Sequence, residues 1–400
     1  MSKSLNDFIN QLGKTRLNLP ASLLQTARQG IDEQITFPST KKEAWKYTRL
    51  TRVSGLSLSS VNPSPGVSRL DDSEFFDIFF NGTKWEMSAP IEGLEICLSS
   101  DASPETWRAC SMEGHVQEIN ALSAQGGVII LIKKGAQIDK AIRMIHYLEG
   151  ENKAMVLHHQ IVIEPMAKAQ IEFIFDVHGK ENYVNVLTDV FVEEGANLQI
   201  DKLQQAQGEQ YTFCNERIYQ ERNSHFAMQT VTHFTHFTRN NVEVKVRGEG
   251  AHTQLYGAFT GNKQQHIDNQ TYIHHEAPNC TSDENYKGVL ADKATGVFNG
   301  KVKVYPDAQK INAYQSNKNI LLPDFASVNA KPELEIYADD VKCSHGSTTG
   351  QLDQQALFFL RARGISSEKA MNMMIEAFLS EIYQAVQSKA ILEKLTRQLD

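Results

Sequence analysis

The stretch "VEEGANLQI", residues 192–200, decides the fold, because similar stretches recur along the chain. Each copy ends one apolar run, passes through a short polar corner with a small residue, and begins another apolar run. The other copies are "IKKGAQI" (132–138), "IEPMAKAQI" (163–171), "RGEGAHTQL" (247–255) and "YPDAQKI" (305–311). Recurrence at a fixed spacing predicts a repeat architecture.

The small corner residue gives the period of the repeat. Successive corners lie 27 to 31 residues apart, and the matches at Ser224 and Pro278 are weaker than the others. The aligned corner residues are Ala136, Ala167, Ala196, Ser224, Ala251, Pro278 and Ala308.

Between the corners, apolar and polar residues alternate, as in Val184-Val186 and Val242-Val244-Val246. A period of two residues predicts β-strands. Because no helical pattern interrupts the strands, each repeat is best interpreted as one coil of a β-solenoid. A β-sandwich is the alternative, since its strands also recur every ~8–12 residues. A sandwich gives no reason for a corner sequence to recur in phase, so the sequence favours the solenoid.

Composition excludes several classes of protein. The 400 residues carry 48 acidic and 40 basic side chains, a net charge of −8, and no basic block, which argues against a nucleic-acid partner. No apolar run is long enough to cross a bilayer, and the first residues do not resemble a signal peptide. There is no GxxxxGK[ST] or GxGxxG motif, so no nucleotide site is predicted. The five cysteines, dispersed and without a CxxC pair, favour a reducing, cytoplasmic location. They are Cys97, Cys110, Cys214, Cys280 and Cys343.

The two ends of the chain have a helical pattern. We expect a mostly helical region at 1–95, a solenoid core at 96–342 and a helical region at 343–400. In the last region, "QLDQQALFFLRARG" predicts a helix that ends at Gly364. Ser366 can cap a second helix, which carries an apolar stripe from Met371 to Val386. This helical pair can cap the solenoid, dock a partner, or do both.

One short motif can carry chemistry. In Cys343-Ser344-His345, an extended backbone directs the thiol and the imidazole to the same side. Both groups bind transition metals and iron–sulfur clusters, but two ligands of the usual four require a site shared with another chain. The alternatives are a structural cysteine beside a solvated histidine, and a Cys–His nucleophile pair without an orienting Asn or Asp.

The remaining polar clusters give weaker signals. His233 and His236 are three residues apart, which is a poor spacing for two ligands on one strand. His274, His275 and Cys280 form a second group, interpreted as ordinary solenoid surface. Asp283 and Glu284 could serve glycoside cleavage only if they faced other carboxylates.

A longer comparison of motifs points to a family. The stretch "KCSHGSTTGQLDQQALFFLRARGIS" (342–366), together with "EAWKYTRL" (43–50), resembles the SufB/SufD family of the SUF iron–sulfur cluster assembly system. The Cys-Ser-His run favours the D branch of that family, and the resemblance covers essentially the whole chain. One departure is Ser347-Thr348-Thr349, where a more apolar run is expected; it affects only local packing.

The resemblance implies a right-handed parallel β-helix flanked by helical regions. It also implies a non-catalytic scaffold that pairs with SufB and with two copies of the ABC-type ATPase SufC. Cys343 and His345 match positions at the SufB–SufD interface. There His345 would bind a transient iron–sulfur cluster shared with SufB, and Cys343 would be an accessory thiol. SufC would dock on the C-terminal helices, for which the candidate residues are Leu357, Phe358, Leu360, Arg361, Met374 and Phe378.

Three functional hypotheses remain open from the sequence. The first is the cluster scaffold, in which SufC closes on ATP and opens the SufB–SufD interface. In that case a neutral His345 is required, and activity is expected to weaken at acid pH. The second is a cytosolic β-helix protein that acts on carbohydrate. The third is a structural subunit in which Cys343 and His345 are inert. The chain can also pair with a copy of itself when the partner is absent, because a solenoid end exposes a sheet edge.

Overall fold

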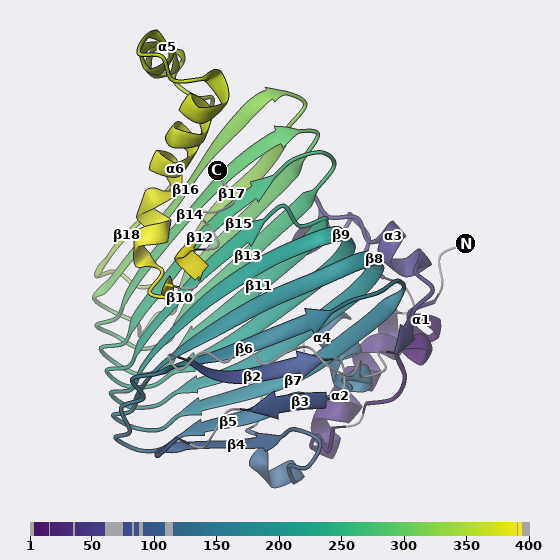
Figure 1. The fold of residues 1–400 in the computed structure, drawn as a ribbon. Helices are drawn as coiled ribbons and strands as arrows, with labels where there is room; N and C mark the ends of the chain where they lie inside the picture. Colours follow the sequence, from purple (N-terminus) through teal and green to yellow (C-terminus); the bar gives the residue numbers. More distant parts are fainter. Residues whose placement is uncertain are drawn as a thin grey trace.

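A computed structural model of the chain describes residues 4–15, 17–34, 37–60, 75–81, 84–87, 91–108, 115–389 and 391–393. The chain forms a β-solenoid with helices at both ends (Figure 1). The solenoid begins near the N-terminal helices and grows coil by coil toward the C-terminal helices. In the described residues, no helix combines the length and the apolar character needed to cross a membrane.

The solenoid has two faces of parallel strands. On face one each coil contributes the strand that follows a corner, and the ladder runs from β2 through β6, β8, β9, β10, β12, β14 and β16 to β18. On face two the ladder runs from β5 through β7, β8, β9, β11 and β13 to β15 and β17. β8 (Lys168–Val192) and β9 (Asn197–Gln220) are long enough to contribute to both faces.

The remaining strands have these bounds: β1 Ser59–Ser60, β2 Phe75–Asn81, β3 Lys84–Met87, β4 Leu94–Leu98, β5 Val128–Ile132, β6 Ala141–Leu148, β7 Lys153–Ile163, β10 His225–His233, β11 Phe237–Val246, β12 His252–Gly261, β13 His266–His275, β14 Thr281–Asp292, β15 Thr295–Val304, β16 Ile311–Asp324, β17 Ser327–Ile336 and β18 Val341–Gly350.

The expected corners are confirmed in the first five positions and wrong in the last two. His252 pairs with Thr281, so the residue stacked on Ala251 is Cys280 and not Pro278. Thr281 in turn pairs with Asn312, so the next stacked corner residue is Ile311 and not Ala308. The reason is that later corners are longer: one early corner comprises residues 193–196, whereas the last comprises residues 305–310. An alignment on small residues misses the added positions.

The alternating apolar residues fill the space between the two faces. Val184, Val186, Val242 and Val244 belong to one continuous buried cluster that includes side chains from nearly every coil. Burial of such a cluster is the main favourable contribution to folding. The two-residue period in the sequence therefore identified the core correctly.

The N-terminal helices cover the outside of face two. They are α1 (Leu5–Leu12), α2 (Ala21–Gln34), α3 (Thr51–Gly55) and α4 (His115–Ser123), with short 3₁₀ turns at Glu43–Trp45 and Pro104–Thr106. Helix residues such as Phe8 share an apolar cluster with the outward side chains Tyr183 and Phe213. The stretch 43–50 is fixed to the same face, because Thr48 donates a hydrogen bond to the buried Asp268.

The C-terminal helices are α5 (Gln354–Ala362) and α6 (Ser367–Ala385). Asp353 and Ser366 cap their N-termini, and Gly364, at φ 86°, ends the first helix as predicted. α6 packs on the outside of face one, whereas α5 projects away from the solenoid and has no buried residue (Figure 1).

Strands extend beyond the region expected for the core. β1, β2, β3 and the start of β4 lie within residues 1–95, and the boundary expected at residue 343 falls inside β18. The last coil therefore ends at Gly350, immediately before α5. Four cysteines are free thiols, namely Cys97, Cys214, Cys280 and Cys343. Cys110 lies outside the described residues.

Lowering the pH from 7 to 5 is expected to destabilise the fold, because buried histidines stay neutral. Burial lowers the pKa of His275 to about 4 and that of His146 to about 3. In the unfolded chain a histidine takes up its proton near ~6.5, so below that pH the unfolded state binds more protons. The contribution of these histidines to the free energy of unfolding is therefore fully present above about pH 6.5. As the pH falls from there toward the pKa of the folded state, each histidine lowers the free energy of unfolding by up to about 1.4 kcal/mol per pH unit.

Thermal melting between pH 5 and pH 8 measures this dependence. His275→Gln should flatten the acid side of the profile, and His178→Gln, at a histidine whose side chain is 32% exposed, is the surface control. A His275→Gln variant with the same acid slope as the parent chain would rule out this source of acid lability.

Candidate functional site

The candidate site lies on β18, the last strand of face one. β18 pairs with β16 on one side, and the described residues supply no ladder on its other side. All of its residues from Ser344 to Gly350 are exposed. On face two, β17 pairs with β15 in the same way. The final coil therefore presents two backbone edges that another sheet can extend.

Cys343 and His345 point toward the interior side of this strand. In the ladder, Cys343 pairs with Ala313 and His345 pairs with Gln315, both of which are buried inward residues of β16. Cys343 packs against the solenoid core, and two residues beyond His345 the Ser347 hydroxyl donates to Asn317 at 3.4 Å. Since residues two apart share a side, His345 faces the same way as Cys343. The thiol and the imidazole thus lie side by side at the open end of the solenoid.

The two groups differ in exposure. His345 is exposed, whereas Cys343 is half-buried. Burial raises the pKa of the Cys343 thiol, and a hydrogen bond with the backbone of Ala313 partly opposes this. The histidine is therefore the more accessible donor, and the cysteine becomes a strong ligand only after it loses its proton.

A polar pair lies directly beneath His345. Gln315 donates from Nε2 to the Glu284 carboxylate at 2.6 Å, and both side chains are buried. Burial raises the pKa of Glu284 to about 7, with hydrogen bonds from Thr271 and Gln315 opposing the shift. The ladder places Glu284, Gln315 and His345 in one column, each one coil above the last. Sequence reasoning missed Gln315, because no motif connects it with His345 and the two residues are brought together only by the ladder.

The side chains that the structure describes do not complete a metal centre by themselves. No group of three His, Cys, Asp or Glu side chains converges on a metal position anywhere in the described ranges. The pair Cys343–His345 fits half of a four-ligand site, as its spacing predicts. An iron–sulfur cluster held here would need further ligands beyond this pair.

The other polar clusters have structural partners, and the prediction that they form ordinary solenoid surface is wrong for His233, His274, His275 and Cys280, which are all buried. His233 is buried between Thr260, at 2.7 Å, and Tyr383, at 3.3 Å. His274 contacts Glu243 at 3.2 Å, and His275 contacts Ser282 at 2.9 Å. The Cys280 thiol donates to the backbone oxygens of Gly248 and Pro278.

The carboxylates considered for carbohydrate cleavage do not form a facing pair. Asp283 lies on the outer surface and accepts a hydrogen bond from Tyr256 at 2.5 Å. Glu284 points inward, to Gln315. A catalytic pair must flank one bond of the substrate, and these two carboxylates are on opposite sides of the same strand.

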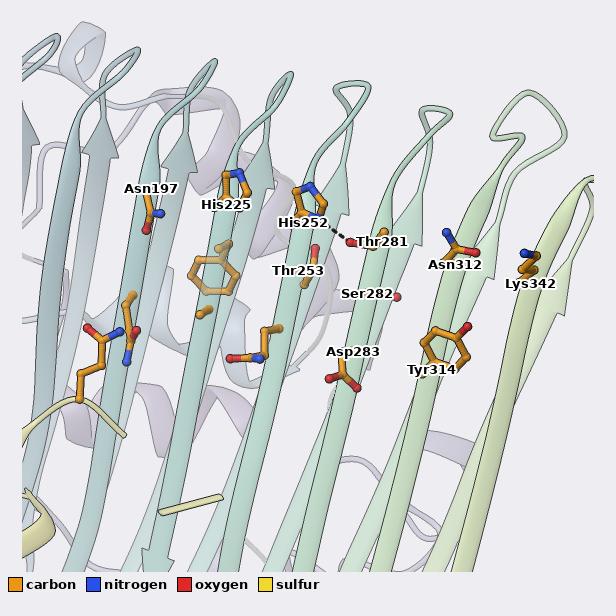
Figure 2. A pocket seen from close by; sticks show the side chains of 15 residues that line it. Asn197, His225, His252, Thr253, Thr281, Ser282, Asp283, Asn312, Tyr314 and Lys342 are labelled. Atoms are coloured by element: carbon orange, nitrogen blue, oxygen red, sulfur yellow. Dashed lines mark hydrogen bonds between the residues drawn. The ribbon is translucent and has the colours of Figure 1, made fainter. Parts of the chain in front are cut away.

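A groove of about 810 Å³ runs across the outside of face one. Figure 2 shows its rows of side chains on successive strands, with His225 and His252 beside Thr281, Asn312 and Lys342. The two imidazole rings stack with their centroids 4.6 Å apart, and His252 contacts Thr281 at 2.6 Å. Lys342 lines this groove while its neighbour Cys343 points inward, so the groove and the thiol–imidazole pair are on opposite sides of β18.

The residues expected to dock a partner fall into two groups. On α5, Phe358 is 72% exposed and Arg361 is also exposed, while Leu357 and Leu360 are half-buried. On α6, Met374 and Phe378 are half-buried, and Phe378 packs against the solenoid. The sequence did not single out Phe359 and Met373, which are 53% and 41% exposed.

Fold and site together define a class: a β-solenoid whose last coil presents a thiol and an imidazole at an exposed strand edge, followed by projecting helices. Residues 146–378 match the family model described as "SUF system FeS cluster assembly, SufBD core domain". The chain therefore belongs to the SufBD family of the SUF iron–sulfur cluster assembly system.

Three relatives illustrate the similarity. The iron–sulfur cluster assembly protein SufD of Escherichia coli is 26% identical over 386 residues, which cover 90% of this chain and 88% of the relative. SufD of Bacillus subtilis is 24% identical over 296 residues, covering 72% of this chain and 67% of the relative. The chloroplastic protein ABCI7 of Arabidopsis thaliana is 28% identical over 287 residues, covering 69% of this chain and 60% of the relative.

Proposed function

We propose that this chain is a scaffold subunit of the SUF system that pairs with SufB through its last coil and with SufC through its C-terminal helices. The nascent iron–sulfur cluster is then cargo that forms at the seam between the two solenoids. The observation that supports this most strongly is that Cys343 and His345 share the interior side of the exposed strand β18. In this role the chain performs no covalent chemistry, and ATP hydrolysis belongs to SufC.

The exposed edges of β17 and β18 are where we expect the seam between the two solenoids to form. A second solenoid that continues the ladders of β17 and β18 would pair backbone groups that are exposed in the single chain. It would also cover His345 and bring its own donors opposite the thiol and the imidazole. A copy of this chain can occupy the same edge when SufB is absent, which would give a homodimer.

The C-terminal helices would connect SufC to the strand that carries the candidate site. α6 is anchored on face one, since Lys287 donates to the backbone oxygen of Phe378 at 2.9 Å and pairs with Glu381 at 2.7 Å. α5 follows β18 directly and projects from the body (Figure 1). Closure of SufC on ATP would therefore move α5 and, through residues 351–353, the strand that bears the site. Opening of the seam would admit iron and sulfide.

Reconstitution tests the proposal. The purified chain, SufB and SufC are mixed with iron, sulfide, ATP and reductant, and cluster formation is followed by visible absorbance and Mössbauer spectroscopy. We expect one stable complex, and cluster yield that falls when this chain is omitted. An equal yield without this chain, or failure of the three proteins to associate, would contradict the scaffold role.

Removal of the exposed aromatic pair on α5 is expected to weaken SufC binding more than tenfold. Truncation of an aromatic at the centre of an interface commonly costs about 2 kcal/mol or more, and about 1.4 kcal/mol is a factor of ten. The variant is Phe358→Ala with Phe359→Ala, and titration calorimetry against SufC gives the affinity. The matched control is Tyr314→Ala, because Tyr314 is 52% exposed but lies on β16. If the two variants bound SufC with equal affinity, the SufC docking surface would not include Phe358 and Phe359.

A further inference from the structure

We propose that Gln315 is the positioning residue of His345: its side-chain oxygen accepts the N–H of one imidazole nitrogen and leaves the other nitrogen free to bind iron. This inference rests on the ligand role proposed for His345 and adds the group that orients it. A histidine that ligates a metal usually donates its second ring N–H to a carbonyl or carboxylate oxygen, which fixes the tautomer and the ring orientation.

The register brings the two side chains together. Gln315 of β16 and His345 of β18 are ladder partners, and both face the interior. Neighbouring strands lie about 4.8 Å apart, so two long side chains at paired positions are within reach of each other. Lys342 and Ser344 alternate to the outer side, so neither can take the place of His345 above Gln315.

The amide of Gln315 is held in one orientation. Nε2 donates to the Glu284 carboxylate at 2.6 Å, so Oε1 is the atom left to accept a further bond. Gly300 makes room for this amide, because a Cβ there would approach Nε2 to 2.4 Å and Cδ to 3.1 Å. Glu284 thus holds the amide in a space that the missing side chain of Gly300 leaves open.

The oxygen of Gln315 has no donor in the described part of the chain. Oε1 is buried and makes no hydrogen bond. An unsatisfied buried acceptor costs about 1–3 kcal/mol, so such an atom in a native site calls for a partner. His345 is the ladder neighbour of Gln315 on the open side, and its ring carries an N–H in either neutral tautomer.

Histidine NMR on the complete free chain tests the inference without any cluster. Ring nitrogens are labelled with ¹⁵N, and the His345 signals are assigned by their loss in His345→Asn. In the parent chain we expect one dominant tautomer at pH 8, and in Gln315→Met a mixture of both. Tyr314→Phe, on the outer side of β16, should change nothing.

Iron binding by the complex with SufB and SufC gives the second readout. Gln315→Met should weaken it about 10–100-fold, the usual effect of losing such a partner. An unchanged His345 tautomer in a folded Gln315→Met chain would overturn the positioning role, whatever the fate of the scaffold proposal. If the methionine variant does not fold, Gln315→Asn, which withdraws the amide by one methylene group, gives the same comparison. Loss of cluster in His345→Ala with an unchanged tautomer in Gln315→Met would leave the scaffold standing and reject this inference alone.

Discussion

Replacing Asp189 with alanine is expected to lower the free energy of unfolding by about 3–5 kcal/mol, because the change leaves a buried guanidinium without its partner. The Asp189 carboxylate accepts two hydrogen bonds from Arg217, at 2.6 and 2.7 Å, and one from His158 at 2.8 Å. All three side chains are buried on the outside of face two, where the His158 ring contacts Trp107. Although burial acts to raise it, the pKa of Asp189 is lowered by Arg217 and His158, so the carboxylate is ionised.

Urea unfolding at pH 7, followed by circular dichroism, measures this loss. The matched control is Glu194→Ala, since Glu194 and Arg222 connect the same two coils at 3.7 Å with exposed side chains. An exposed pair contributes about 0–1 kcal/mol, so the control should lose much less. Equal losses in both variants would show that burial does not determine the strength of these pairs.

Replacing His345 with alanine is expected to reduce cluster formation by the reconstituted complex at least tenfold. Loss of a residue that only hydrogen-bonds to a metal ligand already costs about tenfold or more, and loss of the ligand itself should cost at least as much. The fold should be unaffected, because His345 is an exposed residue of the last strand. Cluster yield is measured by iron and sulfide content after gel filtration of the complex. Cys343→Ser should have a smaller effect, because its thiol is half-buried and is proposed only as an accessory donor.

Lys342→Ala is the control for His345→Ala. Lys342 lies on the same strand but lines the outer groove, so its loss should leave the cluster yield unchanged (Figure 2). Undiminished yield from His345→Ala in an intact complex would reject the ligand role. Equal loss from both variants would indicate that β18 is needed only as a strand edge, which is the structural-subunit hypothesis.

Much of the fold could be predicted from the sequence because successive coils of the solenoid share one pattern of apolar and polar residues. Each coil carries the same alternation, so Val184 and Val244 could be assigned to the core without knowledge of their contacts. The exact stacking could not be predicted throughout, because corners of different length shift the register, as Pro278 and Ala308 show. The region before residue 95 was expected to be mostly helical, and the place of its strands in the solenoid could not be predicted because their partners lie in later coils, as when Phe75 pairs with Ala141.

Only part of the candidate site could be predicted from the sequence. A spacing of two residues predicts that Cys343 and His345 share a side, and the ladder confirms it. What the spacing cannot give is that β18 is the last strand, which depends on the chain leaving the solenoid at Gly350. Gln315 was missed because its relation to His345 exists only across a ladder.

Pulsed electron paramagnetic resonance of the reduced cluster tests most directly whether this chain donates an imidazole to the nascent cluster. The complex is assembled from ¹⁵N-labelled chain with unlabelled SufB and SufC, and hyperfine coupling from ¹⁵N to the cluster is recorded. We predict a strong ¹⁵N coupling that disappears in the complex containing labelled His345→Ala. A cluster that forms in the wild-type complex without any ¹⁵N coupling from the labelled chain would contradict it.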